Sequence, residues 1–314
     1  MQGLPTIPAE KNILKQCRLS KKERRMVITD SILQYRRCLK RRNYSSHTLR
    51  SYMNNLKQFI MWVRVPIETV TYKEILDYMD YLYRKRLGPK TMNCHLNTLR
   101  EFYNYLKYEE QIQMENPVKS GTMARLPDPL PRYLKDEEVD RLFKVIKNKR
   151  DHAMFMLMLR CGLRVEEVAN LTIRSFDLAR SQVSIFKGKG AKGRVVYISH
   201  DAHEAISDYL KSRRSSKTGE VFLVEKGEYK GKGISVRGIQ KRMEYYAGKA
   251  GLQVSCHRLR HTMATQLLNA DADLVVIQDL LGHTRLKTTQ RYCKVSNLKV
   301  QRDYHKAMAV VMNR

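Results

Sequence analysis

A proline-rich segment near the middle of the chain, residues 120–131, limits most strongly how this sequence can fold. It combines three prolines with small and polar residues. Proline lacks an amide proton and interrupts helices, so the segment is expected to be an extended linker. With 314 residues, the chain is long enough for a separate core on each side. We therefore predict two domains, residues 28–119 and 132–314, after a basic extension over residues 1–27.

The first domain has the apolar spacing of a helical bundle. Apolar residues recur every three or four positions, which is the period of a helix with one buried face. The segment from Ser45 to Thr48 offers capping hydroxyls before one such stretch. Gly88-Pro89 opens another, since proline is favoured in the first turn of a helix. We predict four helices, over residues 28–42, 49–63, 72–86 and 89–106.

The second domain has a mixed pattern. Asp136 precedes acidic and apolar residues in the manner of a helix cap, and Arg164 follows a glycine turn at the start of an amphipathic stretch. The apolar runs from Val183 to Phe186 and from Val195 to Ile198 flank a glycine-rich basic turn, which is typical of a β-hairpin. Helical patterns dominate the remainder. The predicted fold class is mainly α with a small β-hairpin or sheet.

Six polar residues of the second domain have side chains suited to breaking a phosphodiester. Arginine forks hold phosphate oxygens, lysine and histidine transfer protons, and a phenol is a nucleophile that forms a covalent intermediate. This chemistry requires no metal ion, and we predict no cofactor. The residues are Arg164, Lys189, His257, Arg260, His283 and Tyr292.

Each residue also has a structural interpretation. His283 follows Leu-Leu-Gly and is typical of a histidine at a helix C-terminus, where the dipole favours cations. Tyr292 is one of 18 tyrosines, which commonly pack as amphipathic side chains. Lys189 lies between two glycines that allow close approach to a phosphate, but Lys187 and Lys192 remain alternatives if the hairpin register differs. The order and spacing of all six residues favour the catalytic interpretation.

The whole ordered pattern resembles the tyrosine recombinase family, the phage integrases and Xer-type recombinases, from about Ile28 to Lys306. The resemblance implies a helical, SAM-like core-binding domain followed by a mixed α/β catalytic domain. Its motifs are the first arginine with an acid three residues later, the hairpin lysine, the His-x-x-Arg pair, the Leu-Gly-His histidine and a tyrosine nine residues on. They fall at Arg164 and Glu167, Lys189, His257 and Arg260, His283, and Tyr292.

The resemblance implies the proton transfers of the reaction. Tyr292 attacks the phosphate and forms a 3′-phosphotyrosine, which conserves the bond energy for rejoining without ATP. A phenol has a pKa near 10 and is protonated at neutral pH, so its attack needs an acceptor, for which His257 is the family candidate. Lys189 protonates the departing 5′ oxygen.

The resemblance also implies how the charge is stabilised. Arg164 and Arg260 hold the non-bridging oxygens, and His283 adds a hydrogen bond. Glu167 positions Arg164 or His257 and transfers no proton. Four subunits are expected to exchange strands through a Holliday junction. The amphipathic tail after Tyr292 is expected to dock on a neighbouring subunit, and the alternative is that it folds back on its own domain.

The composition independently indicates a polyanionic partner. The formal net charge is +29 and the isoelectric point about 10.0, with basic residues in excess on both sides of the linker. No stretch approaches the roughly 20 apolar residues of a membrane span, and residues 1–20 lack the apolar centre of a secretory signal. Six cysteines without a Cys-x-x-Cys pair suggest neither zinc nor disulfides. We expect a cytoplasmic, nucleoid-associated protein.

Double-stranded DNA with paired inverted half-sites is the partner that the resemblance implies, and the positive net charge agrees with it. It would be bound by a homotetramer, alone or with a related recombinase or an accessory protein. Phosphate contacts in the first domain are expected from exposed basic residues. The candidates are Arg41, Arg42, Arg50, Lys90 and Arg100.

Three alternatives stay open at this stage. A type IB-like topoisomerase would use the same residues to nick and reseal one strand. A non-catalytic DNA-binding protein of the same fold would be recognised by loss of catalytic residues, and none is missing. Among recombinases, an Xer-type resolvase of chromosome dimers competes with an integrase or transposase of a mobile element.

Overall fold

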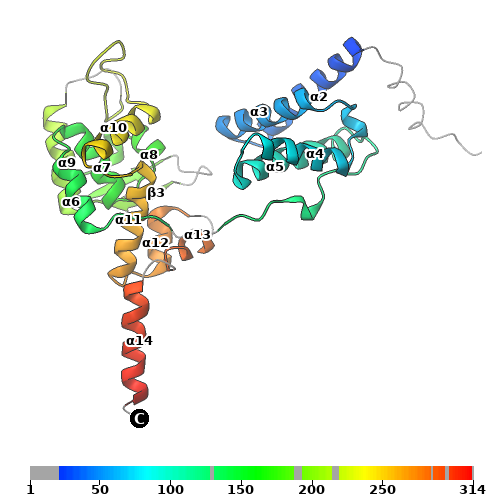
Figure 1. Ribbon diagram of the computed structural model, residues 1–314. Helices are drawn as coiled ribbons and strands as arrows, with labels where there is room; N and C mark the ends of the chain where they lie inside the picture. The colour runs from blue at the N-terminus through cyan, green and yellow to red at the C-terminus, as the bar shows by residue number, and fades with distance from the viewer. Residues whose placement is uncertain are drawn as a thin grey trace, which may run out of the picture. The chain divides into compact units, whose positions relative to one another are not determined.

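The computed structural model describes residues 21–127, 131–186, 193–213, 219–283, 286–293 and 297–312. The chain divides into two compact units, residues 1–128 and 129–314. Figure 1 shows that both are mainly helical and that the small sheet belongs to the second unit. The predicted fold class, mainly α with a small β element, is confirmed.

Among its described residues, the first unit is a bundle of four α-helices, as predicted. They are α2 (Lys21–Arg41), α3 (Ser46–Trp62), α4 (Tyr72–Arg84) and α5 (Pro89–Tyr108). Ser45 caps α3 by accepting a hydrogen bond from the backbone N–H of Thr48, and Pro89 occupies the first turn of α5. The helix α5 packs against the other three and buries one apolar face among them. The local signals of the sequence therefore place the starts of α3 and α5, whereas α2 begins at Lys21, seven residues before the predicted start. Packing around α5 holds the four helices together.

The second unit contains nine helices and three strands among its described residues. The helices α7 and α11 lie at its core, where α7 packs against both α9 and α11. The elements are α6 (Asp136–Lys144), α7 (Lys149–Arg160), α8 (Val165–Ala169), β1 (Phe176–Asp177), β2 (Gln182–Ile185), β3 (Arg194–Tyr197), α9 (His200–Ser212), α10 (Val236–Lys249), α11 (Cys256–Asn269), α12 (Leu274–Leu281), α13 (Leu286–Gln290) and α14 (Asn297–Met312).

The sheet is antiparallel in the order β1-β2-β3. The predicted hairpin is present, but both strands begin and end one residue earlier than the apolar runs, and the short strand β1 was missed. Ile185 pairs with Arg194 at the end of the ladder next to the turn, so the strand contains a charged residue that an apolar pattern leaves out. The turn that holds Lys189 lies outside the described residues.

The prediction that Asp136 caps α6 is wrong by one residue. Lys135 is the N-cap, and its backbone N–H donates to the carboxylate of Glu138 over 2.9 Å. Asp136 is the first helical residue, and its carboxylate accepts a hydrogen bond from the side chain of Gln266 in α11. The carboxylate of Asp136, which the local pattern predicts to cap α6, thus bonds Gln266 from a distant part of the chain instead.

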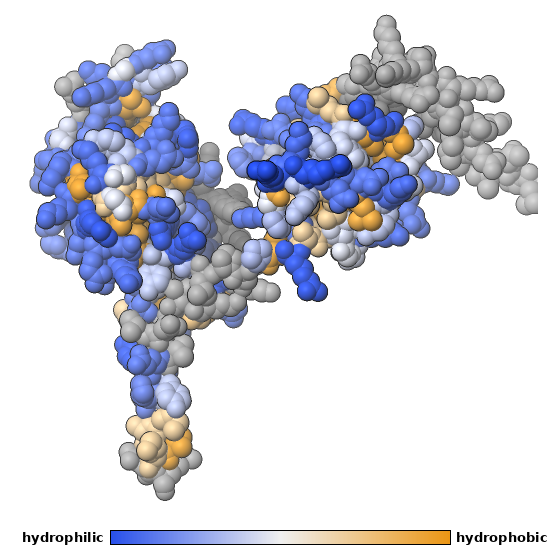
Figure 2. Space-filling model, in the orientation of Figure 1, coloured by the Kyte–Doolittle hydropathy of each residue, from blue (hydrophilic) through white to orange (hydrophobic). Residues whose placement is uncertain are grey.

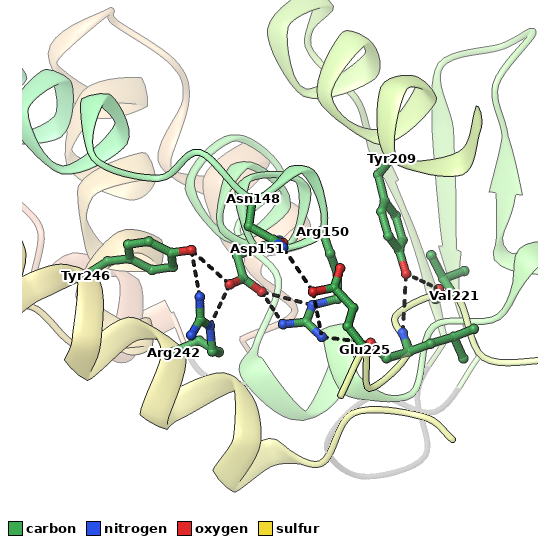
Figure 3. A network of polar contacts seen from close by, with 9 residues as sticks. Asn148, Arg150, Asp151, Tyr209, Val221, Glu225, Arg242 and Tyr246 are labelled. Carbon is green, nitrogen blue, oxygen red and sulfur yellow. Dashed lines mark hydrogen bonds and ion pairs between the residues drawn. The ribbon is translucent and has the colours of Figure 1, made fainter. Parts of the chain in front are cut away.

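A buried ionic network fixes α7 to α10 (Figure 3). The carboxylate of Asp151 is fully buried and accepts from Arg150 at 2.6 Å and from Arg242 at 2.6 Å. The hydroxyl of Tyr246 bonds the same carboxylate, and Arg150 also donates to the backbone carbonyl of Leu223. A buried charge is tolerated only when its hydrogen bonds are satisfied, so this network specifies how these segments pack.

Candidate active site

Five of the six proposed catalytic residues lie close to one another around α11 and the C-terminal end of α12. Arg164 is the N-cap of α8, and Gly282, which ends α12, precedes His283. The sixth residue, Lys189, lies outside the described residues. The five are Arg164, His257, Arg260, His283 and Tyr292.

Three arginines converge on the last carbonyl groups of α12. Arg194 Nε donates to the carbonyl oxygen of residue 280 over 2.8 Å, Arg260 donates to that of residue 281, and Arg164 donates to that of residue 282 over 3.2 Å. The carbonyl groups at a helix C-terminus have no partners within the helix and carry partial negative charge, which favours cations there. The end of α12 therefore orients three guanidinium groups that come from distant parts of the chain.

Gly282 makes this convergence sterically possible. Its φ of +60° is left-handed, and a Cβ atom at this position would lie 3.1 Å from Cδ of Arg194. Both the backbone conformation and the close approach of Arg194 exclude a larger residue. The glycine of the Leu-Gly-His motif thus turns the chain toward His283 and leaves space for Arg194.

Glu167 is the carboxylate that pairs with these arginines. It accepts from Arg164 at 2.9 Å and from the two terminal nitrogens of Arg194 at 2.7 and 2.9 Å. Burial alone raises the pKa of Glu167, but hydrogen bonds from Arg194 and from the backbone N–H of Arg164 outweigh it and hold that pKa at about 2. Glu167 is therefore ionised at neutral pH and joins α8 to β3.

Arg194 is a site residue that sequence analysis missed. In the sequence it ends the glycine-rich basic segment, where several lysines and arginines are equivalent in pattern, and in the structure it is the first residue of β3. Its side chain is only 11% exposed and is bound by groups 27 and 86 residues away. No local signal distinguishes such a buried arginine from its solvated neighbours.

Arg260 is the most deeply buried charge of the site. It is 1% exposed and donates to the carbonyl oxygens of Gly162 and Leu281. Its Nε has no hydrogen-bond partner among the described residues. Burial, followed by the positive charge of Arg164, lowers the pKa of Arg260 to about 9. Glu167 pairs with Arg164 and Arg194, and Arg260 adds a third guanidinium group, so the site has an excess of positive charge that suits an anion.

Tyr292 lies beside this cluster and is 2% exposed. Its hydroxyl forms a hydrogen bond of 2.8 Å with Nδ1 of His261. Burial raises the pKa of Tyr292, and the positive charge of Arg260 partly opposes that shift. Its backbone N–H donates to the carbonyl of Thr289, which fixes the turn after α13.

Two histidine rings lie against the phenol ring of Tyr292, and a third histidine contacts one of them. The ring of His283 lies nearly parallel to that of Tyr292, with centroids 6.4 Å apart, and its Nδ1 bonds the hydroxyl of Thr289 over 2.9 Å. The ring of His257 meets that of His261 edge to face at 4.2 Å. Burial is the main cause that lowers the pKa of His261 and of His283 to about 4. Sequence analysis missed His261, although it follows Arg260 directly and lies one helical turn after His257.

The comparisons with known proteins cover both units. A sequence profile of the phage integrase family matches residues 132–298. A profile of the phage integrase N-terminal SAM-like domain matches residues 32–113. The chain belongs to the phage integrase family, the tyrosine recombinases.

Curated relatives of this recombinase support the same family assignment. The tyrosine recombinase XerC of Staphylococcus aureus (strain bovine RF122 / ET3-1) is 33% identical over 275 residues, which cover 84% of this chain and 91% of that protein. The tyrosine recombinase XerA of Thermococcus kodakarensis is 40% identical over 188 residues, covering 59% of this chain and 66% of that protein. The activity of the family is the cleavage and rejoining of DNA.

Solved structures share the fold. The Tn1549 transposon integrase in complex with transposon right end DNA matches with a TM-score of 0.74 and 17% identity, covering 89% of this chain and 99% of that chain. The XerH site-specific recombinase bound to a palindromic difH substrate matches with a TM-score of 0.68 and 21% identity, covering 85% of this chain and 82% of that one.

The proposed DNA contacts of the recombinase all lie on the first unit. Arg41, Arg50 and Lys90 are exposed. Arg42 forms an ion pair with Glu109 at 2.8 Å, and Arg100 donates to a backbone carbonyl. Exposure leaves Arg41, Arg50 and Lys90 accessible to phosphate, while Arg42 and Arg100 each use one guanidinium nitrogen within the protein. Their role in DNA binding stays a prediction.

Two negative findings apply to the described part of the chain. It holds no cluster of three or more His, Cys, Asp or Glu side chains arranged to bind a metal ion. None of its helices combines the length and apolar character of a membrane span.

Proposed function

We propose that Tyr292 of this recombinase attacks a scissile phosphate bound by Arg164 and Arg260. The observation that carries the proposal is the buried excess of positive charge beside a buried phenol. A phosphodiester brings the negative charge that this site lacks, and guanidinium donors stabilise the additional charge of the transition state. The unpaired Nε of Arg260 is a donor available to a non-bridging oxygen.

The surrounding residues support this reaction. Since Nδ1 of His283 is bonded to Thr289, we assign its Nε2 to a phosphate oxygen. Glu167 holds Arg164 and, with its low pKa, is unsuited to donate a proton at neutral pH. Lys189 remains the proposed proton donor to the leaving 5′ oxygen, and His257 remains the family candidate for proton acceptor.

The expected product is a 3′-phosphotyrosine, from which a 5′ hydroxyl of a partner strand reforms the phosphodiester. Strand exchange would then pass through a Holliday junction, with four subunits on paired inverted half-sites in the cytoplasm at the nucleoid. We assign residues 28–119 to core binding, residues 120–131 to the linker and residues 132–314 to catalysis. Residues 1–27 are assigned to the basic N-terminal extension, of which the part from Lys21 onward lies in α2.

A trapped covalent adduct tests the proposal. The protein is incubated with a nicked suicide duplex, in which cleavage releases a short fragment that carries the free 5′ hydroxyl. Loss of this fragment prevents rejoining, so protein linked to a 3′ phosphate is expected to accumulate. Proteolysis and mass spectrometry should locate the DNA on the peptide that contains Tyr292. DNA on another peptide, or a linkage to a 5′ phosphate, would contradict the assignment.

An Xer-type role is the biological role best supported, because the alignment with XerC spans 91% of that protein. A mobile-element integrase is the alternative, supported by the fold of the Tn1549 integrase. Sequencing of genomic duplexes that become covalently trapped separates the two. A single chromosomal site supports the Xer role, and the ends of a mobile element support the alternative. Relaxation of supercoiled DNA without a specific site would instead indicate a topoisomerase.

We further propose that α14 docks on a neighbouring subunit. Arg302 ties α14 to the end of α11 by an ion pair of 3.0 Å with Asp271. The last residues of the helix are apolar and exposed, and they form an apolar patch at its end in Figure 2. In a cyclic arrangement, each subunit docks its α14 on one neighbour and receives α14 from the other. Four such contacts close a tetramer. The exposed residues are Val310, Val311 and Met312.

Substitution of these three residues by serine is expected to abolish the tetramer on a two-site duplex. Binding of single subunits should remain, because phosphate contacts dominate affinity. Analytical ultracentrifugation measures both states. Serine at the exposed polar positions Gln301 and Lys306 of the same helix is the matched control and should leave the tetramer intact. An unchanged tetramer fraction in the first variant would contradict docking in trans.

A further inference from the structure

The phenol of Tyr292 is in direct contact with His261, a residue to which the family pattern gave no role. The two side chains come from different elements, α11 and the turn after α13. Nδ1 of His261 lies 2.8 Å from the hydroxyl oxygen, and the ring centroids are 5.5 Å apart. We propose that His261 is the catalytic residue that accepts the phenolic proton when Tyr292 attacks the phosphate. This inference rests on the proposed function, in which Tyr292 is the nucleophile.

The position of His261 is fixed from both sides. It follows Arg260, whose guanidinium is held by the carbonyl oxygens of Gly162 and Leu281, and α11 packs against α7. On the other side, the bond from the Tyr292 backbone to Thr289 holds the turn that carries the phenol. The acceptor and the phosphate-binding arginine are therefore consecutive residues of one rigid helix, so one element aligns both with the nucleophile.

The protonation state of His261 suits an acceptor. Burial first, and then the positive charges of His257, Arg260 and Arg291, lower its pKa to about 4, so the ring is neutral at pH 7. A neutral imidazole with its proton on Nε2 leaves Nδ1 free to accept. Binding of a phosphate next to Arg260 offsets part of that positive charge and makes the ring more basic. The site thus becomes a better proton acceptor when DNA is bound.

The step balances as a simple displacement. The O–H bond of Tyr292 breaks and its proton moves to Nδ1 of His261, while the phenolic oxygen bonds to phosphorus. The bond from phosphorus to the 5′ oxygen breaks, and that oxygen takes a proton from Lys189. Rejoining reverses both transfers, and His261 returns the proton to the phenol. No oxidant, metal or further reactant takes part.

His257 has a different place in this arrangement. Its side chain is exposed, and its ring contacts that of His261 at 4.2 Å. It lies one turn earlier on α11, and its ring packs against that of the acceptor proposed here. His257 is therefore the competing candidate for the acceptor, and its substitution is measured beside that of His261.

The test compares His261→Gln and His257→Gln in single-turnover cleavage of a nicked suicide duplex. His261→Gln should lower the cleavage rate by about 10²–10⁴-fold, the usual contribution of general base catalysis. His257→Gln should lower it much less. Thermal melting and gel-shift binding should match the wild type in both variants. If His261→Gln fails to fold, His261→Asn is measured in its place.

Two modifications of the reactants separate proton acceptance from a structural role. Replacement of Tyr292 by 2,3-difluorotyrosine supplies a more acidic phenol and should recover much of the rate lost in His261→Gln. A duplex with a 5′-bridging sulfur at the scissile position needs no acid for its leaving group and should not restore that variant. Rescue by the sulfur substrate, or no rescue by difluorotyrosine, would overturn the inference.

The remaining outcomes are also decisive. A rate for His261→Gln equal to or above that of the wild type would show that His261 accepts no proton and, if higher, that it restrains Tyr292. A larger loss in His257→Gln, rescued by difluorotyrosine, would transfer the role to His257. Adduct formation by Tyr292→Phe would instead overturn the proposed function itself, and the two failures are distinguishable for that reason.

Discussion

Tyr292→Phe is expected to form no covalent adduct with DNA while binding it as well as the wild type does. Phenylalanine keeps the buried ring and loses only the hydroxyl that bonds His261, so the packing around α13 is retained. The nucleophilic oxygen is absent, and the adduct should fall below detection. Denaturing gels on a nicked suicide duplex measure the adduct, and gel shifts measure binding.

Tyr304→Phe is the matched control for this substitution. Tyr304 lies on α14, is 59% exposed and is the tyrosine that follows Tyr292 in the chain. Its variant should form the adduct at the wild-type rate. An adduct that persists in Tyr292→Phe and disappears in Tyr304→Phe would move the nucleophile to the tail helix.

Arg260→Ala is expected to lower the cleavage rate by at least ~10²-fold, the usual cost of removing one donor that stabilises transition-state charge. The effect on DNA binding should be much smaller, because many other basic residues contact the phosphates. Arg260→Lys keeps the charge but loses the fork and the donors to Gly162 and Leu281, so it should recover only part of the rate. Single-turnover cleavage and gel shifts measure the two quantities.

Two controls accompany this experiment: the melting temperature of Arg260→Ala, and the cleavage rate of a variant at a second arginine, Arg160. The lowered pKa of Arg260 means that its charge opposes folding at neutral pH, and this cost offsets the loss of its two hydrogen bonds. Truncation also leaves a cavity where the largest fully buried side chain stood, so the melting temperature of Arg260→Ala is expected to fall and is measured beside the cleavage rate. Arg160→Ala removes an arginine that pairs with Asp201 on α9 and should cleave normally. Wild-type cleavage by Arg260→Ala would exclude Arg260 from the phosphate site.

Local patterns in the sequence predicted much of the architecture. Helical periodicity, the cap at Ser45 and the Pro89 start placed four helices of the first unit. Apolar runs on both sides of a glycine-rich turn placed the hairpin to within one residue, because apolar residues mark the buried face and say less about charged strand ends. The strand β1 has only two residues, too few for a pattern to indicate.

By itself, the sequence determined the family, the fold class and the chemical types gathered in the second unit, since each depends on residue identity and on spacing within short segments. Only the tertiary structure decided that Arg194 shares Glu167 with Arg164, and that His261 contacts Tyr292. The partners of Arg194 lie 27 and 86 residues away, and Tyr292 lies 31 residues after His261. Such contacts arise from helix packing and from burial of charge, which bring distant segments together and leave no local periodicity in the sequence.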